Sequence, residues 1–134
     1  MLEERSAGAI IYRQSPGGKL YLLLNYPSGH WDFVKGNIEK GENFKQTVLR
    51  EIREETGIED ITFVDGFEDK VEYHYQRDGQ VIHKEVVFFV ANTKTNKVVL
   101  SHEHRDYTWL NFNDALEKLT YKTAQNLFKK IKDL

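Results

Sequence analysis

Short apolar runs separated by turn residues dominate the first part of the chain. Residues 7–13 (AGAIIYR) and 20–25 (LYLLLN) are rich in residue types that favour strands. The segment 15–18 (SPGG) between them has the composition of a turn, so the two runs are predicted to form a β-hairpin. A second turn at 27–29 (PSG) precedes 31–34 (WDFV), which is predicted to be a short strand.

The apolar positions take on the period of a helix after residue 42. Residues 43–56 are predicted to form a helix, with Asn43 as its N-cap and Gly57 as its C-cap residue. The side of this helix that is expected to face the core is formed by Val48, Leu49 and Ile52.

Residues 61–92 are rich in strand-forming types, and Asp78-Gly79 marks a tight hairpin turn within them. In a hairpin with a two-residue turn, the numbers of facing residues have a constant sum. Tyr73 is therefore predicted to face Lys84, on the same side of the sheet as Tyr75.

The last third of the chain is predicted to contain two helices. Residues 101–110 precede a helical pattern that starts at Asn113. The final helix is amphipathic, and its apolar face carries Ala124, Leu127, Phe128 and Ile131.

Strands before, between and after helices predict an α/β fold, an α/β/α sandwich with a mixed β-sheet. A chain of 134 residues without repeat or linker is expected to form one domain, residues 1–134.

Composition narrows the class of protein further. Hydrophobic residues make up 40% and charged residues 30%, which is typical of a globular chain. The formal net charge of −2 argues against binding of duplex DNA or long RNA, which favours a basic excess. The absence of cysteine excludes disulfides, thiolate zinc sites and a cysteine nucleophile. No apolar run approaches the ~20 residues of a membrane span, and no secretory segment is recognisable, so a cytoplasmic monomer without membrane contact is expected.

The segment with the clearest chemistry is 50–55 (REIREE). On a helix, Glu51, Glu54 and Glu55 fall within an arc of about 100°, next to the apolar face. Glu51 and Glu55 form a like-charged i, i+4 pair that would destabilise the helix mildly. Mg²⁺ or Mn²⁺, which prefer oxygen ligands, would neutralise this group. Taken alone, the same residues also fit an ordinary charged helix surface.

The spacing of residues 36–58 favours the metal site over a charged surface. It resembles the Nudix box, G-x5-E-x7-R-E-U-x-E-E-x-G-U with U an aliphatic residue, and all nine specified positions match. They are Gly36, Glu42, Arg50, Glu51, Ile52, Glu54, Glu55, Gly57 and Ile58. The resemblance implies a metal-dependent Nudix hydrolase that cleaves a phosphoric anhydride bond in a nucleoside polyphosphate.

The resemblance also implies roles for single residues. Gly36 would bind a metal ion through its carbonyl oxygen, Arg50 would orient a glutamate by a charge-assisted hydrogen bond, and Glu42 would tie the loop to the helix. A carboxylate would take the proton of the attacking water, and Glu54 is one candidate. The carboxylate ligands of the metal would be Glu51, Glu54 and Glu55.

Outside the box, the chain resembles the diadenosine tetraphosphate hydrolases that cleave asymmetrically and release ATP and AMP. The similar segments are 6–13 (SAGAIIYR), 30–31 (HW), 35–36 (KG), 100–104 (LSHEH), Tyr107 and 109–110 (WL).

This second resemblance implies further site residues. Glu103 would be an additional metal ligand or base. Phosphate-binding side chains would be His30, Lys35 and Lys84, and the rings that stack on a base would be Tyr73 and Tyr121. The chain departs from many relatives at 33–34, where Phe-Val stands in place of prolines.

Other interpretations of these residues stay open. Tyr73 and Lys84 also fit a packing residue and a charged strand edge. His102 and His104 could bind zinc with a third histidine, His30, His74 or His83, although the subfamily match explains this block without zinc. Nucleoside triphosphates and triphosphorylated RNA are alternative substrates. A nucleotide-binding sensor without activity is a further alternative, and the intact glutamates argue against it.

Overall fold

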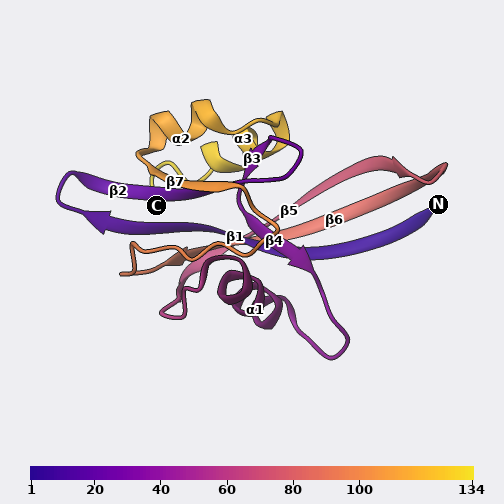
Figure 1. Ribbon diagram of the computed structural model, residues 1–134, viewed down its shortest axis with the longest axis horizontal. Coiled ribbons are helices and arrows are strands. Elements are labelled where there is room, and N and C mark those ends of the chain that lie inside the picture. The colour runs from indigo at the N-terminus through magenta and orange to yellow at the C-terminus, as the bar shows by residue number, and fades with distance from the viewer.

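One mixed sheet lies between helices on its two faces in the computed structural model, which describes residues 1–134 (Figure 1). Helix α1 lies on one face, whereas α2 and α3 lie on the other, so the predicted α/β/α sandwich is confirmed. The strands are β1 (Leu2–Ser15), β2 (Gly18–Asn25), β3 (Trp31–Asp32), β4 (Val34–Asn37), β5 (Thr62–Arg77), β6 (Gln80–Asn92) and β7 (Asp106–Leu110). The helices are α1 (Phe44–Thr56), α2 (Phe112–Lys118) and α3 (Lys122–Lys129).

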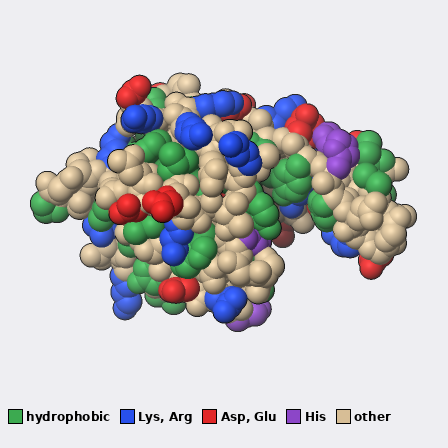
Figure 2. All heavy atoms as spheres, turned by 90° about the horizontal axis from the view of Figure 1, so that it is seen from above, with side chains coloured by type: hydrophobic (Ala, Val, Ile, Leu, Met, Phe, Trp, Pro, Cys, Tyr) green, Lys and Arg blue, Asp and Glu red, His purple; other side chains and the backbone are tan.

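Strand β1 organises the sheet, whose order is β3-β2-β1-β6-β5. It pairs with β6 in parallel and with β2 and β4 antiparallel, while β7 pairs with β2. The short strand β4 is thereby held against the centre of the sheet. The start of β1 and the hairpin of β5 and β6 extend together past the body of the molecule, as Figures 1 and 2 show.

The hairpin of β5 and β6 has the predicted register. Tyr73 faces Lys84, and Tyr75 faces Ile82. Asp78 and Gly79 have φ values of 53° and 78°, which a tight two-residue hairpin turn requires. Turn chemistry alone therefore places a tyrosine and a lysine side by side on one face of the sheet.

Two apolar clusters fill the space between the sheet and its helices. Val48 and Ile52 of α1 pack with Phe89 on one face. Phe88 packs on the other face with the predicted apolar residues of the C-terminal segment, Ala124, Leu127, Phe128 and Ile131. None of the three helices combines the length and the hydrophobicity that a membrane crossing would need.

The caps of α1 are as predicted. The Asn43 side chain accepts from the backbone N–H of Gln46, and the Gln46 side chain accepts from the backbone N–H of Asn43, which completes a capping box. Gly57 has a φ of 76° and donates its N–H to the Arg53 carbonyl oxygen. The loop that precedes α1 is thus joined to the helix in a fixed geometry.

Leu49 was expected to face the core, and this was wrong: the residue is 41% exposed. The buried face of α1 is rotated away from Leu49, because it runs through Val48 and Ile52 to Glu55, which is 3% exposed. The buried face of α1 therefore includes a glutamate, whereas Leu49 lies outside it.

Three element boundaries also differ from the prediction. Strand β1 begins at Leu2 rather than residue 7, because its polar start pairs with β6 through the backbone. Residues 31–34 form two short strands that are separated at Phe33. Helix α2 begins at Phe112 rather than Asn113, since the Asn111 side chain caps it by accepting from the N–H of Asp114.

Substitution of Ile52, which is fully buried between α1 and the sheet, should destabilise the fold. Ile52→Ala should lower the free energy of unfolding by about 2–5 kcal/mol, because it removes packed atoms and leaves a cavity. Leu49→Ala, on the exposed side of the same helix, should cost less than about 1 kcal/mol. Urea denaturation measures both values, and equal losses would contradict the orientation of α1.

Candidate active site

The loop before α1 brings the backbone of Gly36 against the carboxylate of Glu51. Gly36 lies in β4, paired with Ala7 of β1, while Glu51 projects from the third turn of α1. A Cβ atom on Gly36 would lie 2.0 Å from the carboxyl carbon of Glu51. Only glycine therefore fits position 36 while this carboxylate stays in place.

Arg50 joins the loop to the helix through several charge-assisted hydrogen bonds. Its Nε and Nη2 donate to Glu42 at 2.7 and 3.1 Å, and Nη2 also donates to the carbonyl oxygen of Asn37 at 2.9 Å. Its Nη1 donates to Glu51 at 2.7 Å and to Glu54 at 3.2 Å. The hydrogen bond from Arg50 is the largest cause that lowers the pKa of Glu42, to about 2. Glu42 thus lies where it ties the loop to the helix.

Glu51 and Glu55 are crowded together beside the core. Burial raises the pKa of Glu51, and the nearby charge of Glu55 raises it further. Burial also raises the pKa of Glu55, to which the charges of Glu103 and Glu54 add. Both shifts arise first from burial, and neighbouring carboxylates add to them.

One oxygen of Glu55 is buried without a hydrogen-bond partner. Its Oε1 lies 2.5 Å from Nε2 of His104, whereas Oε2 contacts no donor. An unpartnered buried carboxylate oxygen is costly, and a cation would satisfy it. Oxygen donors, the unpartnered Oε2 and the close approach of Glu51 to the backbone of Gly36 all fit a hard divalent ion.

A hollow of about 390 Å³ opens beside these carboxylates. Glu51 and the exposed Glu103 both line it, as does Gly36. Glu54 does not line it: its side chain is 55% exposed and pairs with Arg50. The full lining is Tyr26, Lys35, Gly36, Asn37, Glu39, Arg50, Glu51, Lys84 and Glu103.

A larger cleft of about 550 Å³ lies next to this hollow, on the side of the sheet that carries α3. It contains all five side chains predicted to bind substrate, although they come from four separate parts of the chain. The lining is His30, Asp32, Lys35, Tyr73, Tyr75, Lys84, Tyr121, Lys122 and Thr123. Figure 2 shows basic side chains on the face that carries α2 and α3. The cleft is therefore aromatic and basic, as a nucleotide site requires.

Lys35 and Lys84 line both the cleft and the carboxylate hollow. Burial, the largest single cause, would lower the pKa of Lys35, but the charge and hydrogen bond of Asp32 together with the influence of Tyr73 outweigh it, and the pKa is raised. Burial lowers the pKa of Lys84, and the nearby charge of Glu4, 3.8 Å away, opposes this shift. Two ammonium groups thus lie between an aromatic cleft and a group of carboxylates.

A series of rings leads from the cleft to the buried glutamate. The ring of Tyr121 lies 5.1 Å from that of His30, which stacks on Tyr26 at 4.6 Å. Tyr26 meets His104 edge-on at 4.6 Å, and His104 contacts Glu55. Burial lowers the pKa of His30, and the charge of Asp32 opposes this shift.

The alternative zinc site at the two histidines of the 100–104 block does not form. His104 is buried against Glu55, whereas His102 is exposed. The histidines considered as a third ligand lie elsewhere: His74 stacks on His83 at 4.9 Å, and His30 stacks on Tyr26. The donor atoms do not converge on one point.

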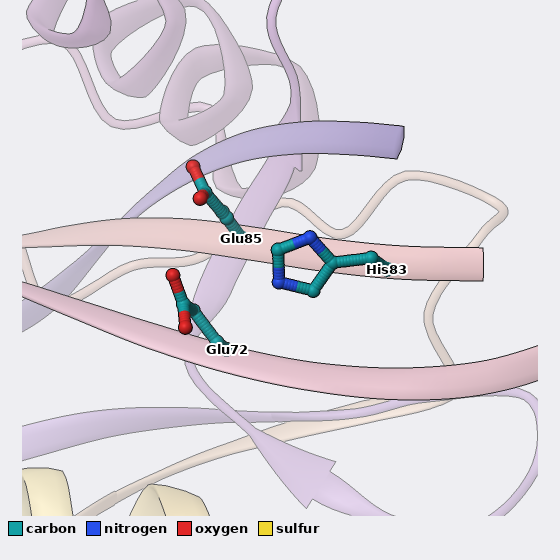
Figure 3. Close-up of side chains that lie close together, drawn as sticks. All are labelled: Glu72, His83 and Glu85. Atoms are coloured by element: carbon teal, nitrogen blue, oxygen red, sulfur yellow. The ribbon is translucent and has the colours of Figure 1, made fainter. Parts of the chain in front are cut away.

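A separate group of potential ligands lies on β5 and β6, on the face that carries α1 (Figure 3). The donor atoms of Glu72, His83 and Glu85 lie within 4.8 Å of one another. Lys70 pairs with both carboxylates, at 3.0 and 3.6 Å, and His83 pairs with Glu3 at 2.6 Å. Lys70 thus offsets part of the charge of the two carboxylates without a metal ion.

Sequence reasoning missed three residues of the site. No sequence pattern pointed to Tyr26 or Asp32 as site residues, because their contacts depend on how β2, β3 and β4 pack together. Glu39 adds a contact of 3.1 Å to Arg50, and only its acidic type and its closeness to Glu42 could have pointed to it.

Comparisons with known proteins agree with this geometry. A model of the NUDIX domain matches residues 3–131. The asymmetrical bis(5'-nucleosyl)-tetraphosphatase of Mus musculus is 35% identical over 130 residues, which cover 88% of this chain and 86% of the mouse protein. The RNA pyrophosphohydrolase of a Nitratiruptor species is 29% identical over 115 residues, with 75% and 74% covered.

Among solved structures, the binary complex of a C. elegans Ap4A hydrolase superposes with a TM-score of 0.83. It is 31% identical to this chain, and the match covers 96% of this chain and 94% of the C. elegans protein. The match to the domain model over nearly the full length and the similarity of both sequence and structure lead to one assignment. The chain belongs to the Nudix hydrolase family.

Proposed function

We propose that this Nudix hydrolase cleaves diadenosine tetraphosphate asymmetrically into ATP and AMP, with Mg²⁺ or Mn²⁺ as its cofactor. The observation that carries the proposal is the pair of lysines, Lys35 and Lys84, that lines both the aromatic cleft and the carboxylate hollow. The names of the mouse and C. elegans relatives support the same substrate.

The cleft fits a nucleotide that carries a long polyphosphate. Tyr73 and Tyr121 enter the cleft from β5 and from the start of α3, and each ring can stack on a base. Lys35 and Lys84 would then bind the phosphates that follow, at the border with the hollow. The phosphates beyond them would reach the carboxylates of α1.

Glu51, Glu55 and the carbonyl oxygen of Gly36 would hold the metal. Glu103, which lines the hollow, would add a ligand, and so would Glu54, which lies outside the lining but is held by the same Arg50 nitrogen as Glu51. When bound there, a divalent cation polarises the phosphate oxygens and lowers the pKa of the attacking water.

Side chains of the protein itself carry out the other steps of the reaction. Arg50 keeps Glu51 and Glu54 in place through its hydrogen bonds. Glu54 or Glu103 accepts the proton of the water as its oxygen bonds to phosphorus and the anhydride bond breaks. Lys35 and Lys84 orient the polyphosphate for this displacement.

The RNA pyrophosphohydrolase relative favours a second candidate substrate, triphosphorylated RNA. A panel of diadenosine polyphosphates, nucleoside triphosphates and triphosphorylated RNA, incubated with the protein and Mg²⁺, separates the candidates. We expect ATP and AMP to form fastest from diadenosine tetraphosphate. Faster release of pyrophosphate from RNA would overturn this choice.

Glu55→Gln should abolish most turnover while the protein stays folded. The variant removes a charge that the metal requires but keeps the size of the side chain and an acceptor for His104. We expect kcat to fall at least about a hundredfold, in line with the loss of one major electrostatic contribution to the transition state. Glu59→Gln changes an exposed carboxylate beyond the helix and should leave turnover unchanged. Near-normal activity of Glu55→Gln would favour a nucleotide sensor or a different catalytic group.

Tyr73→Ala should weaken substrate binding more than chemistry. Loss of base stacking of roughly 1–3 kcal/mol corresponds to a KM increase of about five- to 150-fold. Tyr73→Phe keeps the ring and should retain most of the affinity. Steady-state kinetics with the dinucleotide measures both variants, and an unchanged KM for Tyr73→Ala would assign this ring to packing alone.

A further inference from the structure

Asp32 places a buried carboxylate in a cleft that is otherwise suited to phosphate. It lines the cleft between His30 and Lys35, and the residue is 4% exposed. A negative charge at this position repels phosphate. We therefore expect Asp32 to have a function that compensates for this repulsion.

The two oxygens of Asp32 each have a different donor. Oδ1 accepts the backbone N–H of Phe33 at 2.7 Å, and Oδ2 accepts from Nζ of Lys35 at 2.9 Å. The carboxylate thus holds the backbone in place where β3 ends and β4 begins, and it also holds the side chain of Lys35.

Phe33 and Val34 make this frame rigid. Phe33 is fully buried in the cluster under α2 and α3, and Val34 is buried in the cluster under α1. The segment is therefore anchored on both faces of the sheet. Burial of two apolar side chains and the bridge from Asp32 hold its backbone in place.

Lys35 needs such a partner because its side chain is only 19% exposed. A largely buried ammonium needs a hydrogen-bonded counter-charge to offset its desolvation and to hold its orientation. Asp32 supplies the charge, and Nζ of Lys35 lies 5.9 Å from the centre of the Tyr73 ring, at the entrance from the cleft to the hollow.

We propose that Asp32 is a positioning residue that holds the Lys35 side chain directed toward the polyphosphate. The proposal rests on the proposed function, since Lys35 is the residue that would touch the substrate. A carboxylate is required because two donors need two acceptors, whereas asparagine offers only one oxygen and would turn its NH₂ group toward the other donor.

A double-mutant cycle of Asp32→Asn and Lys35→Met tests the proposal. With diadenosine tetraphosphate and Mg²⁺, Asp32→Asn should raise KM by about tenfold, the effect of losing one hydrogen bond to a charged group, while kcat changes by less than about twofold. In the Lys35→Met background, Asp32→Asn should give no further rise. Glu117→Gln, an exposed carboxylate on α2, is the matched control and should change neither constant.

Two results would overturn the proposal. An unchanged or lower KM for Asp32→Asn would mean that the carboxylate only competes with phosphate for the lysine. An equal rise in KM in both backgrounds would assign Asp32 to the loop structure alone. Thermal unfolding checks that each variant is folded. If Asp32→Asn is not, Asp32→Ser replaces it in the same cycle, because the serine hydroxyl still accepts the N–H of Phe33.

The wild-type protein separates failure of this inference from failure of the proposed function. Release of ATP and AMP from the dinucleotide tests the function. If none is released, the cycle is repeated by calorimetry with a non-hydrolysable methylene-bridged analogue, whose Kd replaces KM. The same tenfold weakening, absent in the Lys35→Met background, would support the role of Asp32. Failure of the wild type to bind the analogue would contradict it.

Discussion

The approach of Glu51 to the backbone of Gly36 is the constraint on which the rest of the site depends. It requires β4 to pair with β1, position 36 to lack a side chain, and α1 to place Glu51 and Glu55 on one side beside the core. Like charges at such a position destabilise a helix, and burial adds to the cost. The cost is understandable if a divalent cation completes the group, since stability in the metal-free protein is then given up for metal binding.

The positive charges of the site are likewise offset by charges close to them. Asp32 forms an ion pair with Lys35, and Glu4 forms one with Lys84. Each lysine that lines both the cleft and the carboxylate hollow therefore has its own carboxylate. Glu4 is in turn fixed by the hydroxyl of Tyr75 and by Arg77 at 3.1 Å. Such pairs keep two half-buried ammonium groups apart from each other and in place before a substrate arrives. Preorganisation of this kind lowers the free-energy cost of ordering these side chains when the substrate binds.

Much of the site could be predicted from local sequence, and the rest depended on tertiary contacts. The spacing from Gly36 to Ile58 was enough to predict the carboxylates of the helix. The turn at Asp78-Gly79 was enough to predict that Tyr73 faces Lys84. Both predictions succeed because they depend only on residues close in sequence. The burial of Glu55 and the exposure of Leu49 were missed, since both depend on how α1 is rotated against the sheet. The partnership of Asp32 with Lys35 was also missed, because it arises where one strand ends and the next begins on a different partner.

The affinity for Mn²⁺ of Gly36→Ala, beside wild type, tests the central claim most directly. A methyl group at position 36 would lie 2.0 Å from the carboxyl carbon of Glu51 and must displace it, whereas the same change at Gly17 meets open space. Electron paramagnetic resonance of free Mn²⁺ should show binding by wild type and Gly17→Ala, and a Kd raised at least about tenfold for Gly36→Ala, as for loss of one charged ligand. Equal Mn²⁺ affinity in all three proteins would contradict a metal site at Gly36 and Glu51.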